Sequence, residues 1–454
     1  PHPWNLLALA VIATLAALLL HHVVFRLLRR VVGRTRSEAD EMLVRRLAMP
    51  TRFALVALAL VLIGAISKSA LVPLHFWLPG AMAAPTPVSA YLHAAAMVKA
   101  GVYLVARLTP GFADAPPWRP TVVVLGSLTL LIAGWRALRE YDLKLVLAYG
   151  TVSQLGMITV MVGTGGGDMM LAGLALLCAH AMFKATLFMV VGVIDHATGT
   201  RDIRELAWLG ARSPALLVIA AAAAASMAGL PPFFGFVAKE AAFETLLHSP
   251  ELGGSAPFVL AAIVLGSTFT FMYSLRVVWG GFARKGQPEP SPLVARMHKP
   301  SLVFLASPAV LATAGLLFGV FPSPVDSALS SYARTLPGGV DYYLALWHGF
   351  GLPVVLSAVV IGVGTAAFFG RRRLPRLRSR WLSLGDADER YDAVVRAADR
   401  LSLRATGVTQ RGSIPAIQAT VMATLVLLPL AMLAWGARDR VELRPWDSPL
   451  QAVI

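Results

Sequence analysis

The chain has 454 residues, of which 57% are hydrophobic and only 14% are charged, and its mean hydropathy is +0.68. Water-soluble domains carry about a quarter charged residues, so this composition excludes an ordinary soluble protein and indicates one solvated mostly by lipid. The net charge of +16 comes mostly from arginines in short loops beside apolar runs, a pattern that sets membrane topology and does not indicate nucleic-acid binding.

Apolar stretches of about 18 residues or more predict transmembrane helices. About eleven such stretches follow one another, near residues 5–25, 53–72, 88–107, 120–135, 145–163, 170–194, 214–247, 257–280, 301–321, 347–370 and 413–435. The predicted fold class is therefore all-α, a polytopic bundle of transmembrane helices. The chain begins at Pro1 without a methionine, and no small-residue cleavage site follows its first apolar run. We expect an incomplete or processed chain.

The distribution of Lys and Arg among the predicted loops gives the orientation. Loops 136–144, 197–213, 281–299 and 371–411 fall on one side and hold 21 Lys or Arg, whereas loops 108–119, 164–169, 249–256 and 322–343 hold two. The first set is predicted to be cytoplasmic. Residues 26–52 carry eight arginines but fall on the opposite side. We therefore expect either an atypical first span or an end that lacks its native context.

Four regions are predicted along the chain. They are an atypical N-terminal span with a basic segment at 1–52, a transmembrane core at 53–370, a basic cytoplasmic segment at 371–411, and a C-terminal span and tail at 412–454. The third region is partly amphipathic, so it either lies along the membrane surface, binds a partner subunit or serves as a solvated linker.

The apolar stretch 214–247 contains the sequence Gly-Leu-Pro-Pro, which ends in Pro231 and Pro232. Each proline removes a backbone donor and fixes φ, so the helix is predicted to break there. Non-helical backbone at membrane depth is tolerated only against protein or a water-filled cavity. A break close to Lys239 and Glu240 therefore favours a functional cavity over a kink that only serves packing.

Three separate spans carry a lysine well inside an apolar run, namely Lys99, Lys184 and Lys239. Such lysines are costly in lipid and usually face a bundle interior or a wet cavity. Desolvation lowers the pKa of a lysine in general, and histidine titrates near neutral pH, so a chain of such groups can relay protons. His180 lies four residues before Lys184 and shares its helix face, and His93 precedes Lys99.

Three positions, Lys68, His180 and His75, also allow a structural interpretation. Lys68 lies at the end of a span, where it could snorkel to the interface, and His180 could serve as a helix-packing hydrogen-bond donor. For His75, which lies beside Trp77, we favour a place in the aromatic belt at the membrane interface.

A cluster of Asp195, His196, Arg201 and Asp202 stands at a predicted helix end. Its spacing is no recognised ligand set, so we predict a capped, ion-paired helix terminus rather than a metal site. The single cysteine, Cys178, can build no intrachain disulfide or thiolate cluster, and no phosphate loop, Ser-His-Asp arrangement or HExxH motif occurs. We expect no metal, no cofactor and no enzymatic activity.

Four stretches resemble the antiporter-like subunits shared by respiratory complex I and the Mrp multisubunit cation/proton antiporters. They are SKSALVPLHFWLPGAMAAPTPVSAYLHAAAMVKAGVYLVARL at 67–108, DLKLVLAYGTVSQLGMI at 142–158, HAMFKATLFMVVGVIDHATGTRDI at 180–203, and MAGLPPFFGFVAKEAAFE at 227–244. MVKAG around Lys99, VIDHATGTRDI, and YLALWHGFGLPVVLS at 343–357 resemble the large A subunit of Mrp antiporters more than its complex I homologue. The resemblance implies inverted repeats, each with one broken helix.

The resemblance also implies an ion pathway. It matches Lys68 to the central lysine of a first half-channel, His93 and Lys99 to the relay beside it, His180 and Lys184 to the links onward, and Lys239 to the lysine at the exit. Family members pair the first lysine with a glutamate two helices earlier, whereas the span at 5–25 contains no acid. The family's earlier helices are also missing from this sequence.

The leading hypothesis is a subunit that exchanges a monovalent cation, Na⁺ by resemblance, for protons within a hetero-oligomeric complex of the inner (cytoplasmic) membrane. Its partners would be other membrane subunits. One alternative is a proton-translocating subunit of complex I or a related respiratory assembly. Another is a non-transporting assembly scaffold, which the missing glutamate favours and the retained lysines oppose.

Overall fold

The computed structural model describes residues 18–19, 22–26, 38–370, 396, 399–400, 402–404 and 414–436. These residues form helices and connecting loops, and the only strand-like pairing among them is an antiparallel bridge between Asp142 and Asp202. Eight helical segments among them are long and apolar enough to cross a membrane. The all-α, polytopic transmembrane fold predicted from the sequence is therefore confirmed.

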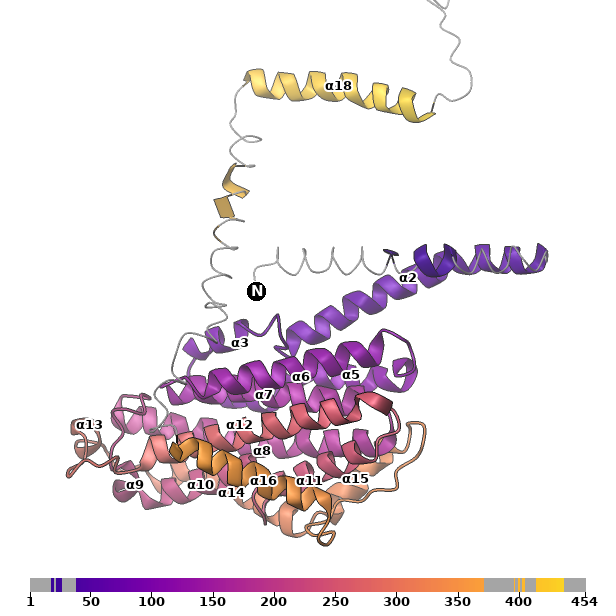
Figure 1. Ribbon diagram of the computed structural model, residues 1–454. Coiled ribbons are helices and arrows are strands. Elements are labelled where there is room, and N and C mark those ends of the chain that lie inside the picture. The colour runs from indigo at the N-terminus through magenta and orange to yellow at the C-terminus, as the bar shows by residue number, and fades with distance from the viewer. Residues whose placement is uncertain are drawn as a thin grey trace, which may run out of the picture. The chain divides into compact units, whose positions relative to one another are not determined.

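The described helices belong to two units, residues 3–382 and residues 383–454. The helices of the first unit are α2 (Glu38–Lys68), α3 (Trp77–Gly80), η1 (Ala81–Ala83), α4 (Thr86–Ser89), η2 (Ala90–Ala96), α5 (Lys99–Phe112), α6 (Trp118–Ala137), α7 (Leu143–Gly163), α8 (Gly167–Thr198), α9 (Leu209–Arg212), α10 (Pro214–Ala228), α11 (Phe234–Leu247), η3 (Gly253–Ser255), α12 (Ala256–Phe282), α13 (Pro292–Ala295), α14 (Leu302–Val320), α15 (Ser323–Ala333) and α16 (Leu352–Gly370). Figure 1 shows the long helices from α5 to α16 packed beside one another as a bundle.

The N-terminal spans differ from their predicted bounds. The predicted span at 53–72 is the C-terminal part of α2, which already begins at Glu38 within the arginine-rich segment. The predicted span at 88–107 lies within one longer helical segment, Thr86–Phe112, in which the π-helical stretch η2 connects α4 to α5. The predicted span at 5–25 and the amphipathic segment 371–411 lie almost entirely outside the described residues.

Helix α7 lies at the centre of the bundle, since 94% of an 18-residue stretch of it is buried. Its N-terminus is capped by Asp142, whose side chain accepts hydrogen bonds from the backbone N–H groups of Lys144 and Leu145. A Cβ atom on Gly156 would lie 2.5 Å from the carbonyl oxygen of Gly126. The absence of side chains at these two positions therefore lets α6 and α7 pack closely.

The predicted helix break is present between α10 and α11. Pro214 starts α10 at a position where a missing N–H costs nothing, and Gly229 ends it in the left-handed conformation with φ of 79°. Pro231 and Pro232 occupy the non-helical link before α11 begins at Phe234. The break therefore lies next to Lys239, as the sequence predicts.

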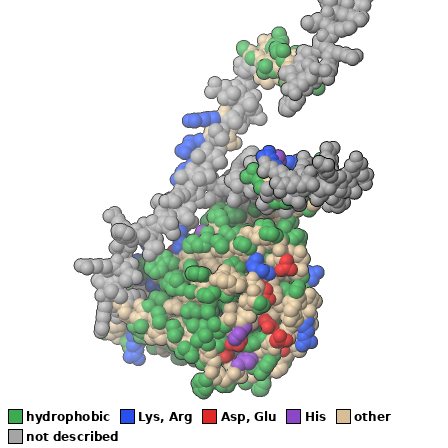
Figure 2. All heavy atoms as spheres, turned by 45° about the vertical axis from the view of Figure 1, so that its right-hand side comes forward, with side chains coloured by type: hydrophobic (Ala, Val, Ile, Leu, Met, Phe, Trp, Pro, Cys, Tyr) green, Lys and Arg blue, Asp and Glu red, His purple; other side chains and the backbone are tan. Residues whose placement is uncertain are grey.

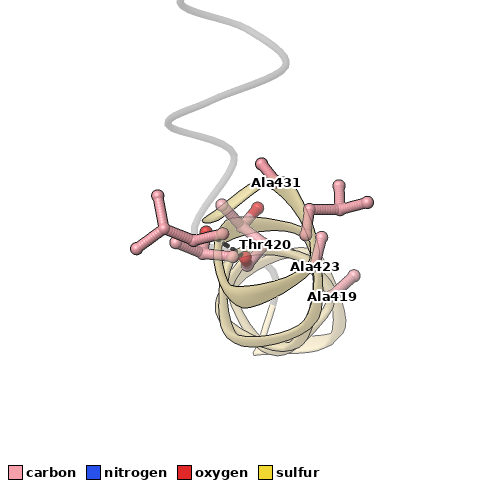
Figure 3. Close-up of a pocket in the computed structure, with 7 residues that line it drawn as sticks. Ala419, Thr420, Ala423 and Ala431 are labelled. Atoms are coloured by element: carbon pink, nitrogen blue, oxygen red, sulfur yellow. Dashed lines mark hydrogen bonds between the residues drawn. The ribbon is translucent and has the colours of Figure 1, made fainter. Parts of the chain in front are cut away.

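The surface of the first unit is largely hydrophobic on the face drawn in Figure 2, as expected for helices that meet lipid. In the second unit, α18 (Ile414–Gly436) matches the span predicted at 413–435. A hollow of about 560 Å³ lies along α18, lined by Ala419, Thr420, Ala423, Thr424, Leu427, Leu428 and Ala431 (Figure 3). All these residues come from one helix, so the hollow is the surface of that helix and not an enclosed site.

Candidate functional site

Four lysines are buried in the bundle of the first unit. Their exposed fractions are 8% for Lys99, 1% for Lys144, 0% for Lys184 and 4% for Lys239. Each donates a hydrogen bond from its Nζ to a backbone carbonyl, and within the described residues none pairs with a carboxylate. A buried ammonium without a counter-ion is costly, and in membrane proteins such groups mark ion pathways.

Lys184 of α8 lies in a polar pocket between α7, α8 and α12. Its Nζ lies 3.1 Å from the carbonyl oxygen of Leu147 and 5.5 Å from the centre of the Tyr273 ring. A Cβ atom on Gly150 would lie 2.8 Å from this Nζ. The glycine therefore leaves the space that the lysine head group occupies.

A hydrogen-bond network continues from this pocket along α7 and α12. The Nε2 of Gln154 donates to the Oγ1 of Thr270 at 2.8 Å and to the hydroxyl of Tyr273 at 3.3 Å. The single proton of the Tyr273 hydroxyl has two acceptors within hydrogen-bond distance, the Oγ1 of Thr270 at 3.1 Å and the carbonyl oxygen of Gly150 at 3.4 Å. Buried hydroxyl and amide groups next to a lysine give a proton several positions to occupy.

His180 lies between two of the lysines. It is fully buried, its ring packs edge-on against Phe183 at 5.5 Å, and it interacts electrostatically with both Lys99 and Lys184. Among the described residues neither of its ring nitrogens has a hydrogen-bond partner. The structure therefore brings together the predicted residues Lys99, His180 and Lys184.

His93 is also buried, on the π-helical turn η2, with its ring centre 6.3 Å from that of Trp77. Its charged neighbour is Lys144, whose Nζ donates to the carbonyl oxygen of Ala84 at 2.5 Å. The sequence places Lys144 in a loop, and its burial at the start of α7 could not be predicted from that position. Within the described residues the Nδ1 of His93 has no hydrogen-bond partner.

The side chain of Lys239 lies at the break between α10 and α11. Its Nζ donates to the carbonyl oxygens of Met227 and Ala228, each at 3.0 Å, which the end of α10 leaves free. A Cβ atom on Gly229 would lie 2.6 Å from the Cδ of Lys239. Glu240, the next residue, is 3% exposed and makes no ion pair with Lys239 in the described part of the chain. The break thus supplies the partners of the lysine.

Lys68, at the end of α2, is exposed, whereas the other lysines of the predicted pathway are buried. One sequence expectation differs from the structure. His75 is only 7% exposed, so the prediction that it belongs to an interfacial belt is wrong, because belt residues face the lipid headgroups. Its neighbour Trp77 is half-buried and donates to the carbonyl oxygen of Ser67 at 2.9 Å.

The acidic and basic cluster at the end of α8 is ion-paired, as predicted. Arg201 lies 3.2 Å from Asp142 and 3.8 Å from Asp195, which ties α8 to the start of α7. The Arg204 guanidinium hydrogen-bonds to Asp202 and holds the pKa of that carboxyl below its usual range. In the described ranges no group of three His, Cys, Asp or Glu side chains could hold a metal ion.

Residues 8–270 match the family described as NADH:quinone oxidoreductase/Mrp antiporter, TM. The chain belongs to this antiporter family. It is 42% identical over 332 residues to Na(+)/H(+) antiporter subunit A1 of Staphylococcus aureus strain Newman, a match that covers 68% of this chain and 41% of that protein. Subunit A1 of strain COL matches equally well. The chain therefore spans about two fifths of the length of these relatives.

Two solved structures of membrane complexes are similar to the chain. A structure of the Mrp complex from Dietzia sp. DQ12-45-1b matches with a TM-score of 0.75 and 36% identity, covering 87% of this chain and 43% of that one. An archaeal respiratory complex, the membrane-bound sulfane sulfur reductase, matches with a TM-score of 0.66 and 23% identity over 94% of this chain and 76% of that one, and so supports the fold alone. The predicted resemblance to the A subunit of Mrp antiporters is confirmed.

Sequence reasoning missed three polar residues of this antiporter-family core, namely Lys144, Gln154 and Tyr273. Gln154 and Tyr273 lie inside predicted apolar spans, where an uncharged polar residue changes mean hydropathy little. A search for every hydrogen-bonding side chain inside the spans would have found both. The burial of Lys144 could be predicted only with knowledge of which segment packs over the start of α7.

Proposed function

We propose that the chain is a membrane subunit of a monovalent cation/proton antiporter complex, with Na⁺ as the cation, that relays protons through buried lysines and histidines. The observation that carries the proposal is the set of Lys99, His180 and Lys184, all buried on adjoining helices without carboxylate partners in the described chain. The names of the relatives supply the ion, since they are called Na(+)/H(+) antiporter subunits.

In this proposal each lysine alternates between a charged and a neutral form. The charged form of Lys99 is stabilised by the carbonyl oxygen of Leu177 at 3.2 Å, and that of Lys184 by Leu147 and the Tyr273 ring. A proton released by one of these lysines reaches the other through the imidazole of His180, which can accept at one nitrogen and donate at the other.

Two further predicted groups, His93 and Lys239, extend this relay to both sides. His93 lies beside Lys144, which was not predicted and which is buried at the start of α7, and Lys239 lies at the helix break. The partners proposed are other membrane subunits, in the inner (cytoplasmic) membrane. A transporter subunit is favoured over an enzyme because the buried groups lie along helices and do not converge on a reaction centre.

The alternative that keeps the same relay is a proton-translocating subunit of a respiratory complex, which the family description and the respiratory fold match both allow. The two functions differ in their energy source. An antiporter exchanges Na⁺ for protons when only an ion gradient is present, whereas a respiratory subunit needs electron donors.

The test uses vesicles that hold the assembled complex, an imposed Na⁺ gradient and a pH-sensitive dye. Lys99→Ala is expected to reduce Na⁺-dependent proton flux by about a hundredfold, the usual effect of removing a positioned proton-transfer group, while assembly is retained. Lys299→Ala is the matched control, because Lys299 is exposed in a loop on the Lys- and Arg-rich side. Undiminished flux in Lys99→Ala would refute the relay, and flux that requires an electron donor would favour the respiratory alternative.

A further inference from the structure

Helix α11 carries a second set of titratable residues beyond Lys239. Glu240, Glu244 and His248 follow one another at four-residue spacing, which places them on one face of the helix. Glu240 is 3% exposed, whereas the side chains of Glu244 and His248 are 35% and 73% exposed. This face therefore runs from the interior to the surface near loop 249–256, on the side that is poor in Lys and Arg.

The innermost residue of this face, Glu240, has one carboxylate oxygen without a hydrogen-bond partner in the described part of the chain. Within the described residues the Oε2 of Glu240 accepts no hydrogen bond, although the carboxyl is buried. Lys239 does not neutralise it, because its Nζ is bonded to the carbonyls of Met227 and Ala228. Glu240 and Glu244 repel each other when both are ionised, since they lie one turn apart. The pair is therefore suited to hold a proton between them.

The next step outward is a contact between Glu244 and His248. The Nδ1 of His248 lies 3.2 Å from the Oε1 of Glu244 and 3.1 Å from the backbone carbonyl oxygen of the same residue. Of these two oxygens only the carboxylate oxygen can take up a proton, so a proton can pass between the carboxylate and the imidazole. His248 also lies at the C-terminal end of α11, where a cation is favoured by the helix dipole. A purely structural His248 is therefore the alternative that the experiment must separate.

Loop 336–351 is held against two helices of the first unit, α8 and α15. The Oδ1 of Asp168 accepts hydrogen bonds from the backbone N–H groups of Asp341 and Tyr342, at 2.9 and 3.0 Å, and Asp326 accepts one from Leu344 at 2.8 Å. Figure 2 shows acidic and histidine side chains gathered on one face of the first unit. The loop is thus tied to α8 and α15 by carboxylates.

Tyr342 of this loop lies beside the two glutamates. Burial, followed by the negative charges of Glu240 and Glu244, raises the pKa of its hydroxyl, so the tyrosine remains a neutral donor. Its ring stacks on His348 at 4.9 Å, and its hydroxyl lies 3.4 Å from the Nδ1 of that histidine. Asp326 and Tyr343 are the other charged or titratable groups that act on Tyr342.

We propose that Glu240, Glu244 and His248 form a proton ladder that connects the buried part of α11 beside Lys239 with the surface on the side poor in Lys and Arg. The proposal rests on the proposed function. In it a proton held by Glu240 passes to Glu244, then to His248 and finally to water, and the reverse order admits protons. Glu244 and His248 are the residues that give the path its outer opening.

The first experiment tests whether the ladder is open to water. Glu244→Cys, in vesicles of known orientation that hold the assembled complex, is treated with a membrane-impermeant methanethiosulfonate from each side. We expect reaction only from the side poor in Lys and Arg. Thr245→Cys is the matched control, since Thr245 is 5% exposed on another face of α11, and the wild type gives the background of Cys178. Failure of Glu244→Cys to react, or reaction from the opposite side, would overturn the ladder.

The second experiment tests whether the ladder conducts. Glu244→Gln is expected to lower Na⁺-dependent proton flux by about tenfold, because the amide cannot carry the proton onward, and Glu244→Asp to restore most of it. Asp114→Asn is the control on the same side, where the side chain is 91% exposed, and should leave flux unchanged. His248→Gln should shift the pH profile of flux, which a structural histidine would leave in place.

The outcomes separate the two proposals. If the wild type exchanges Na⁺ for protons and Glu244→Gln matches it, the ladder is refuted and the proposed function stands. If the wild type shows no exchange, the proposed function fails, and the labelling of Glu244→Cys still decides whether the face is open to water.

Discussion

Positive charge is held differently in the interior of the bundle around α7 and α8 and in the loops before α7 and after α8, which lie on the Lys- and Arg-rich side. In the loops, Arg201 is paired with Asp142 and Asp195, and Arg204 is paired with Asp202. In the interior, Lys99 and Lys184 are bonded only to carbonyl oxygens and ring faces within the described chain. Paired cations fix the ends of the helices, whereas unpaired cations are free to change protonation.

This difference predicts two classes of variant. Changes in the interior should remove transport and leave assembly intact, because an alanine is easily accommodated in a helix while a proton path needs every titratable group. Changes in the loops should affect stability by small amounts and leave transport nearly unchanged, because exposed ion pairs contribute little.

Lys239 gives the largest expected effect. Lys239→Ala should reduce flux about a hundredfold, and Lys239→Arg should fail nearly as badly, because arginine keeps its charge but does not release a proton near neutral pH. Flux in oriented vesicles is the measurement, with Lys299→Arg as the exposed control. Recovery of flux in Lys239→Arg would assign Lys239 a structural role and leave Lys99 and Lys184 to carry the transport proposal.

Gly150→Ala tests the pocket of Lys184 without removing any titratable group. The added Cβ would lie 2.8 Å from the Lys184 Nζ and 3.0 Å from the Tyr273 ring, so the ammonium must shift. We expect flux to fall about tenfold, as expected when a proton-transfer group is misplaced, while assembly is retained. Gly362→Ala is a suitable control, since nothing lies within 4 Å of a Cβ there. Equal flux in both variants would contradict the assigned role of Lys184.

The sequence predicted the spans and the helix break because both depend on local properties. Runs of apolar residues identify helices by length, and Pro231 and Pro232 remove backbone donors wherever they occur. The burial of Lys99, Lys184 and Lys239 followed from their apolar flanks. These features need no knowledge of what packs against them.

The sequence could not predict features that depend on packing between distant segments. Lys144 is buried because Ala84, 60 residues earlier in the chain, lies over the start of α7. Lys68 follows a long apolar run in the sequence, yet α2 leaves it exposed. The contact between Gln154 and Tyr273 joins residues 119 apart. To predict any of these three features, one must know how the helices are arranged, and hydropathy alone does not give that arrangement.

Arg201→Gln should affect stability more than transport. It removes the pairs with Asp142 and Asp195, whose side chains are about one third exposed, so the loss of unfolding free energy should not exceed about 1 kcal/mol. Thermal unfolding of the detergent-solubilised complex measures this loss, and flux should remain within about twofold of the wild type, as expected for a surface pair. A collapse of flux in a stable Arg201→Gln complex would remove the division between loop and interior.

Asp202→Asn gives the smallest effect and the clearest dependence on pH. The hydrogen bond from Arg204 lowers the pKa of Asp202 in the folded chain, so the folded state binds the proton less readily than the unfolded state. The ionised carboxyl therefore stabilises the fold above its unfolded pKa of about 3.9, and this contribution is lost as the pH falls through the lower folded value.

The midpoint of thermal unfolding should thus differ between the wild type and Asp202→Asn at pH 6 to 7, and the two should converge as the pH falls below about 4. Asp114→Asn, with a side chain 91% exposed, should differ little from the wild type throughout. A difference for Asp202→Asn that stays constant as the carboxyl is protonated would show that the side chain acts through packing. In that case ion pairing would not stabilise the loop arginines. The contrast between paired arginines in the loops and unpaired lysines in the interior would then lose its physical basis.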